Sequence, residues 1–257
     1  MKAFWQLFRK DLQALQFTMV LFSVITLAWD VFLFTRVGKW QEGLPFGLSF
    51  IPLAFLQLWV VWDAIQSYRS EWNSGSIYLM LSLPTSGWKL ALSKLAAVWT
   101  SFTLLSILSL SGAWFILMRE TELAHEIMNM LRQVPQGYLL SGAFRLALAY
   151  WLSGLATALV VQAAYVTSRL VSRGQFFVLL GALWASAYGL LRLGGLGHYL
   201  FGWVPDLQFK ALEVGPEQVR VAETFLVVDS GILLGWALGL GLLYILTARL
   251  LQQVVEV

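Results

Sequence analysis

The two histidines of the chain are its most obvious candidates for chemistry. His125 begins the string His-Glu-Ile-Met-Asn, which contains the first half of the zinc-binding pattern H-E-x-x-H. Asn129 stands where the second histidine ligand would be needed, so this string does not predict a zinc site. His198 is isolated at the edge of an apolar segment, where a hydrogen-bonded structural role is more typical than that of a general base.

Other catalytic patterns are missing from the sequence. The chain has no cysteine, which excludes a thiolate nucleophile, a thiolate metal site and a disulfide framework. No G-x-S-x-G string occurs, no acidic pair lies in the middle of an apolar segment, and no G-x-x-x-x-G-K-[ST] phosphate loop is present. We therefore expect no enzymatic activity in this chain, with no catalytic residue, no metal site and no cofactor site.

The composition indicates a protein that lies mostly in lipid. Of the 257 residues, 59% are hydrophobic and only 12% are charged, whereas about 25% are charged in a typical soluble domain. The 13 tryptophans and 8 tyrosines suit a chain that meets the membrane surface many times. The net charge is +3 with basic residues scattered along the chain, so nothing indicates nucleic-acid binding.

Apolar runs of sufficient length define the fold. A spanning helix needs about 20 apolar residues, because its backbone polar groups must pair internally across the hydrocarbon. We predict six such helices, at residues 17–35, 46–65, 90–117, 141–167, 175–191 and 229–248. The expected fold is an all-α polytopic membrane protein in which residues 1–257 form one transmembrane domain, without a nucleotide-binding domain.

The N-terminal residues predict an amphipathic helix that lies in the membrane interface. At 100° per residue one face is apolar and the other is basic or amidic, with Asp11 the one charge on the apolar side. Lysine and arginine are almost evenly divided between the two sides of the membrane, and most acidic residues lie on the side opposite the termini. We expect both termini to be cytoplasmic, in the cell membrane.

The connection after the second predicted span contains a short apolar run. Residues 76–83 are too short to cross a membrane, and Gly75 and Pro84 interrupt the helix on either side of them. An ordinary surface loop would not need Ile77, Tyr78 and Leu81, so we interpret this run as a short helix that docks a cytosolic partner. Beyond it, Lys89 and Lys94 are expected to extend from the base of the third span towards the interface.

The same connection resembles the first intracellular loop of permease subunits of ABC-2 type transporters. That family has the approximate pattern Glu, three residues, Gly-Thr, an apolar run to Leu-Ser-x-Pro, then x-Ser-Arg and a later Lys. The matching residues here are Glu71, Gly75, Ser76, Leu81, Ser82, Pro84, Ser86 and Lys94. Ser76 replaces the usual Thr, and Gly87 stands where the family often has Arg.

This resemblance implies a permease, most often an exporter, that works with a second permease copy or a paralogue. Two cytosolic ATPase subunits would bind ATP and Mg²⁺, and the short helix would be the coupling helix that seats in the ATPase. Glu71 would then pair with a basic group of the ATPase or cap the short helix. The alternative is a membrane scaffold that recruits a cytosolic protein without moving a substrate. The substrate and the choice between homodimer and heterodimer stay open.

Polar and small residues within the spans give three further expectations. Gln57 and Gln162 line a transport path or bridge helices, whereas Asp30 and Asp63 anchor span ends near Arg36 and Arg69. A stripe of small residues predicts close helix packing in the sixth span; it consists of Gly231, Gly235 and Gly239. Residues 194–205, apolar but too short to cross, predict a re-entrant or surface-lying element.

Overall fold

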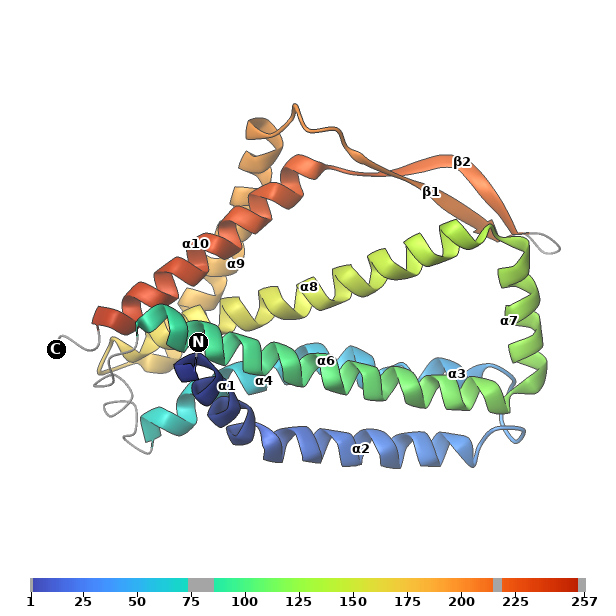
Figure 1. Ribbon diagram of the computed structural model, residues 1–257, viewed down its shortest axis with the longest axis horizontal. Helices are drawn as coiled ribbons and strands as arrows, with labels where there is room; N and C mark the ends of the chain where they lie inside the picture. The colour runs from blue at the N-terminus through green and yellow to red at the C-terminus, as the bar shows by residue number, and fades with distance from the viewer. Residues whose placement is uncertain (1, 74–85, 215–218, 254–257) are drawn as a thin grey trace.

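The computed structural model describes residues 2–73, 86–214 and 219–253, and this part of the chain is mostly helical (Figure 1). The first four helices are α1 (Lys2–Ala14), α2 (Gln16–Phe34), the short α3 (Leu44–Leu48) and α4 (Ile51–Asn73). The remaining elements are α6 (Gly87–Arg119), α7 (Thr121–Gln133), α8 (Gln136–Arg169), α9 (Gln175–Leu200), β1 (Leu207–Val214), β2 (Val219–Val228) and α10 (Ser230–Gln253).

Six of the described helices are long and apolar enough to cross a membrane, namely α2, α4 together with α3, α6, α8, α9 and α10. Their centres agree with the six predicted spans, but α6 and α8 are 33 and 34 residues long. Hydropathy reports only the part of a helix that suits hydrocarbon, whereas backbone hydrogen bonding continues into the polar flanks. The chain is therefore a helical protein with the make-up of a multi-pass membrane protein.

Large apolar side chains cover the outside of the bundle. On α9, Phe177 is 77% exposed and Trp184 is 70% exposed, and Phe115 of α6 and Leu146 of α8 are similarly open. Monomeric soluble proteins rarely expose continuous apolar surface on this scale. Lipid chains are the solvent that such a surface fits.

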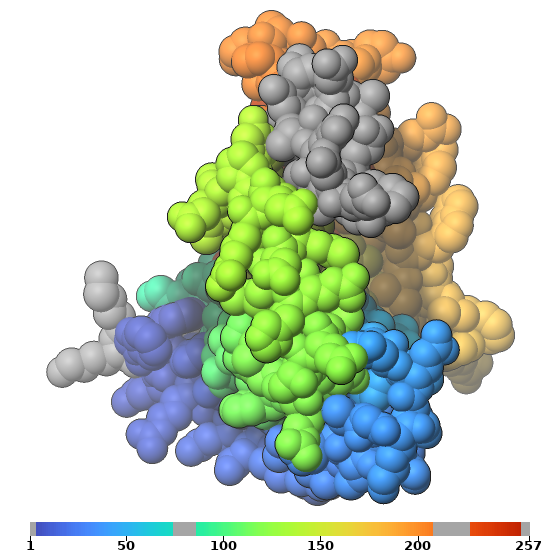
Figure 2. All heavy atoms as spheres, turned by 90° about the vertical axis from the view of Figure 1, so that its right-hand side faces the viewer, coloured from blue at the N-terminus to red at the C-terminus, as the bar shows by residue number. Residues whose placement is uncertain are grey.

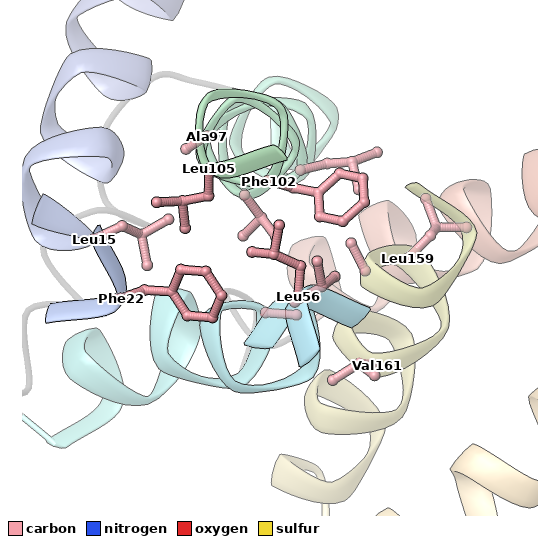
Figure 3. Close-up of a cluster of buried hydrophobic side chains, with 13 residues drawn as sticks. Leu15, Phe22, Leu56, Ala97, Phe102, Leu105, Leu159 and Val161 are labelled. Atoms are coloured by element: carbon pink, nitrogen blue, oxygen red, sulfur yellow. The ribbon is translucent and has the colours of Figure 1, made fainter. Parts of the chain in front are cut away.

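The core lies where α2, α4, α6 and α8 meet. Phe22 of α2, Leu56 of α4, Phe102 of α6 and Leu159 of α8 converge there in one buried cluster (Figure 3). Gly154 makes the contact between α8 and α6 close, because a Cβ at this position would lie 2.5 Å from the Phe102 ring.

Two strands form an antiparallel hairpin between α9 and α10, which the all-α prediction missed. β1 pairs with β2 in a register that joins Leu207 to Val228 and Val214 to Val219, with an irregularity between Lys210 and Leu212. The sequence Val-Arg-Val-Ala-Glu-Thr-Phe-Leu-Val-Val is rich in β-branched residues and partly alternates polar with apolar ones. This pattern favours a strand, and the description as all-α is wrong to that extent.

The predicted re-entrant or surface-lying element at residues 194–205 is also wrong for most of its length. Residues up to Leu200 continue α9 as its last two turns. The glycines that suggested a break instead allow α10 to approach, because a Cβ at Gly197 would lie 2.6 Å from the Cα of Gly235. Small residues here serve helix packing rather than a turn.

The helix α1 and the C-terminal end of α10 lie at the same end of the molecule (Figure 1). The end of α4, the start of α6 and the connection between α8 and α9 lie there too. This end is called the basal end below. The helix α7 lies at the opposite end, across the ends of α6 and α8.

Candidate functional site

A buried group of charged and polar residues joins α1, α4 and α6 at the basal end. We call it the basal cluster; it consists of Lys10, Asp11, Ser67, Glu71, Ser93 and Lys94. Two of its members, Glu71 and Lys94, flank residues 74–85 in the sequence, the segment at the centre of the family resemblance.

Lys94 is the centre of the basal cluster. Its side chain is 0% exposed, and Nζ lies 2.7 Å from Glu71 Oε2 and 3.2 Å from Asp11 Oδ1. It also donates a hydrogen bond of 2.7 Å to the Ser67 carbonyl oxygen. Three oxygens thus surround the buried ammonium group: the Asp11 and Ser67 oxygens accept hydrogen bonds, and Glu71 Oε2 is an ion-pair partner. The expectation that Lys94 extends to the interface is therefore wrong, although Lys89 is exposed as expected.

Asp11, the single charge on the apolar side of α1, has polar partners on α6. Its Oδ1 faces Lys94, and its Oδ2 accepts a hydrogen bond of 2.7 Å from the Ser93 hydroxyl. Burial raises the pKa of Asp11 above its ordinary value of 3.8, while Lys94 and the Ser93 hydrogen bond oppose this rise. The buried side of α1 thus contains Leu7 and Asp11, and α1 is fixed to the bundle by an ion pair as well as by apolar contact.

Glu71 is paired within its own chain. Its Oε1 lies 2.9 Å from Lys10 Nζ, and its Oε2 faces Lys94, while the side chain is nearly buried. Both carboxyl oxygens of Glu71 thus face lysines of the same chain, and Lys10 is the half-exposed edge of the cluster. Pairing of Glu71 with an ATPase, or capping of the short helix, which lies outside the described residues, stays a prediction.

The pairing has a simple consequence for the connection between α4 and α6. Glu71 stands three residues before the segment 74–85 and Lys94 nine residues after it, so their contact ties the two ends of the segment together. Separating two buried charges leaves each of them without its partner away from water, which costs several kcal/mol, about 3–5 when one partner is removed. The cluster can therefore hold α1, α4 and α6 as one rigid base.

Five of the predicted docking residues lie outside the described residues. They are Gly75, Ile77, Tyr78, Leu81 and Pro84. Their role stays a prediction. The departure from the family pattern at Gly87 has a physical reason, because a Cβ there would lie 2.7 Å from the Ala248 carbonyl oxygen of α10. An arginine side chain has no room at this contact.

The glycine stripe of α10 packs against α9 of the same chain. A Cβ at Gly235 would lie 2.9 Å from the Cα of Gly197, and it would also touch the Leu193 carbonyl oxygen. A Cβ at Gly239 would lie 2.6 Å from Leu190, and one at Gly231 would lie 2.8 Å from the Gly197 carbonyl oxygen. The stripe thus belongs to a contact within one chain.

Gln57 and Gln162 are not brought together. The Gln57 amide donates a hydrogen bond of 2.8 Å to the Ser153 hydroxyl and so bridges α4 to α8. Gln162 is buried in α8, and its Nε2 has no hydrogen-bond partner among the described residues. Ser153 and Gln162 are nine residues apart on α8, a rise of about 13 Å along the helix, so the two amides are at different levels of the bundle. Their part in a transport path stays a prediction.

Asp30 and Asp63 are packed inside the bundle, so their description as interfacial anchors is wrong. Asp63 accepts a hydrogen bond of 2.9 Å from the Ser101 hydroxyl and is 2% exposed. Asp30 lies against Gly112 of α6, and neither of its carboxyl oxygens has a hydrogen-bond partner in the described chain. Arg36, its expected partner, instead stacks over the rings of Phe32 and Trp40.

The two histidines have local partners. His125 Nδ1 lies 2.6 Å from the Thr121 carbonyl oxygen on the same helix. His198 Nδ1 contacts Asp229, whose other carboxyl oxygen accepts a hydrogen bond of 3.1 Å from the Ile232 amide at the start of α10. The hydrogen bond from His198 lowers the pKa of Asp229.

The described residues contain no group of three or more His, Asp and Glu side chains placed to hold a metal ion. The basal cluster pairs the two lysines Lys10 and Lys94 with the two carboxylates Asp11 and Glu71. Its arrangement suits the mechanical linkage of helices. Comparison of the chain with protein-family models, with curated proteins and with solved structures finds no significant match.

Proposed function

We propose that this chain is the membrane permease subunit of an ATP-driven transporter of the ABC-2 type. In this proposal the residues 76–83 dock a separate cytosolic ATPase, and the chain supplies the path across the membrane. A second copy or a paralogue completes the permease, and export is the direction that the resemblance favours.

One observation carries the proposal. The first and last residues of the family pattern, Glu71 and Lys94, are 23 positions apart in sequence and form a buried ion pair with 2.7 Å between Nζ and Oε2. A connection that only had to join two spans would not need a buried ion pair across its base. A connection that must transmit force would, because displacement of the docking segment then moves α4 and α6 together.

The basal cluster also offers a route from that segment into the membrane. Asp11 joins α1 to the same lysine, and Ser67 joins α4. Any movement of the segment would reach three helices through one side chain. The sequence has no phosphate loop of its own, so the proposal assigns ATP and Mg²⁺ to the partner ATPase.

The experiment is purification of the tagged full chain from its own cells in a mild detergent, with identification of the proteins that accompany it. The proposal predicts a stoichiometric ATPase with a phosphate loop. It also predicts that the reconstituted complex moves a substrate across vesicles only when ATP is hydrolysed.

The scaffold alternative gives a different result. A partner that lacks a phosphate loop, or an ATPase complex that hydrolyses ATP without moving any compound from the cells' own extract, would contradict the transporter. Vesicles with a phosphate-loop lysine variant of the ATPase are the control, since they keep the complex and lose only hydrolysis.

A further inference from the structure

The helix α7 has two chemically distinct faces. At 100° per residue its polar residues fall on one side and its apolar residues on the other. The polar face consists of Thr121, Glu122, His125, Glu126, Asn129, Arg132 and Gln133. The apolar face consists of Leu123, Ala124, Ile127, Met128, Met130 and Leu131.

Only the N-terminal half of the apolar face is covered by the rest of the described chain. Ala124 is buried, and Leu123 lies beside Gly43 of the connection between α2 and α3. The Gly43 amide donates a hydrogen bond of 3.0 Å to Glu120, which holds the start of α7 in place. In the C-terminal half, Met128 is 45% exposed, Met130 38% and Leu131 40%.

The position of α7 indicates what covers the open half. It begins directly after α6 and ends directly before α8, both of which are candidate spans, and it lies across their ends (Figure 1). Figure 2 shows this end of the molecule, with α7 across its front. The helix α7 therefore joins the ends of two candidate spans and crosses between them at one end of the bundle.

The chain on either side of α7 exposes large apolar side chains too. Trp114, Phe115 and Met118 are exposed on the last turns of α6, and Tyr138 and Leu140 are exposed at the start of α8. Tryptophan and tyrosine favour the headgroup level of a bilayer. The open half of α7 therefore stands in the chain between two helix ends whose exposed side chains suit a membrane interface.

We propose that α7 is an interfacial helix on the side of the membrane opposite the termini, with its apolar face in the acyl boundary of that leaflet. The polar face carries Glu122, Glu126 and Arg132 without an excess of basic residues. Burial of apolar side chains rather than attraction to anionic headgroups therefore drives the contact, and zwitterionic phospholipid suffices. This inference does not depend on the proposed transporter function.

The absence of native cysteine allows a direct test with single spin labels. The full chain is reconstituted in phosphatidylcholine vesicles with one cysteine at a time, either Met128→Cys or Leu131→Cys on the apolar face, or Glu126→Cys or Asn129→Cys on the polar face. Collisions with oxygen, which concentrates in lipid, are compared with collisions with a water-soluble nickel chelate. The labels at positions 128 and 131 are expected to meet oxygen and to be shielded from nickel, and those at 126 and 129 the reverse.

Two results would overturn the proposal. Equal access of nickel to all four labels would place α7 in water, away from the lipid. Shielding of positions 128 and 131 from both reagents would show that protein, such as a second copy of the chain, covers the face. Hydrogen exchange of the unmodified chain guards against label artefacts, because α7 amides must exchange more slowly in lipid nanodiscs than in lipid-free amphipol.

Discussion

The ammonium nitrogen of Lys94 lies 2.7 Å from a carboxyl oxygen of Glu71, and the Lys94 side chain has no exposed surface. These two residues stand on either side of the segment 74–85, so one ion pair closes the base of the connection between α4 and α6. Asp11 adds α1 to the same lysine. The mechanical role proposed for this end of the molecule depends on that geometry.

Replacing Lys94 by methionine is expected to lower the free energy of unfolding by about 3–5 kcal/mol, because Asp11 and Glu71 would be left buried without their shared cation. Lys89→Met is the control, since Lys89 is exposed on the same helix. Chemical unfolding in detergent measures both. The triple variant D11N/E71Q/K94M should recover part of the loss, and a Lys94→Met protein as stable as Lys89→Met would show that the pairing contributes nothing.

The stability of the protein should also depend on pH through Asp11. Burial raises the pKa of Asp11 above 3.8, so between that value and the raised pKa the folded chain binds more protons at Asp11 than the unfolded chain does. Its contribution to stability is therefore lost as the pH rises through this interval. The groups that face this carboxyl, Lys94, Glu71 and Ser93, are the same in the wild type and in an Asp11→Asn variant.

The measurement is the difference in thermal midpoint between wild type and Asp11→Asn, followed from about pH 4 upwards. The wild type should lose stability relative to the variant as the pH rises. Glu122→Gln, which removes an exposed carboxylate of α7, is the control and should leave the wild-type profile unchanged. Parallel profiles for wild type and Asp11→Asn would contradict the role of burial.

The contact between α9 and α10 predicts opposite outcomes for two glycines of α10. Gly235→Ala should destabilise the fold by about 1–3 kcal/mol, because its Cβ would meet the backbone of α9. Gly241 has no atom within 4 Å of an added Cβ, so Gly241→Ala should be neutral or stabilising by up to about 1 kcal/mol through helix propensity. Unfolding of the two variants in detergent compares them, and equal stability would place the stripe in lipid.

The orientation of the chain is tested with two engineered cysteines. Ser172→Cys lies in the connection at the basal end, and Glu126→Cys lies on α7 at the opposite end. If the basal end is cytoplasmic, a membrane-impermeant thiol reagent should label position 126 in intact cells and position 172 only after permeabilisation. The reverse labelling would invert the topology.

Much of the fold could be predicted from the sequence because it depends on local patterns. Six apolar runs give six long helices, and the 3.6-residue period gives α1. The hairpin is not evident from apolar runs in the sequence, because Arg220 and Glu223 interrupt the apolar residues of β2. The continuation of α9 past Gly194 was missed because glycine alone does not distinguish a break from a close helix contact.

The basal cluster could not be predicted in full because it pairs residues far apart in sequence. Asp11 on the apolar side of α1 was a visible anomaly, and Lys94 was a visible charge near a span, but 83 positions separate them. A local sequence pattern does not show which buried acidic residue pairs with which buried lysine. The two ion pairs of Glu71 are not visible in the local sequence either, since its lysines lie on two other helices.

The central claim is that residues 76–83 dock a cytosolic ATPase, and the double variant Tyr78→Ser/Leu81→Ser tests it most directly. Losing two large apolar contacts should remove about 3 kcal/mol of binding free energy, taking roughly 1.5 kcal/mol for each side chain. This is more than about a hundredfold in affinity. The matched control is Leu170→Ser/Val171→Ser, which alters two exposed apolar residues of another connection at the same end.

The quantity to measure is the amount of ATPase that co-purifies with each permease variant from the membrane fraction. The account predicts that the Tyr78 and Leu81 variant inserts normally yet loses its ATPase and its transport, while the Leu170 and Val171 variant keeps both. A Tyr78→Ser/Leu81→Ser permease that retained stoichiometric ATPase and full transport would contradict it.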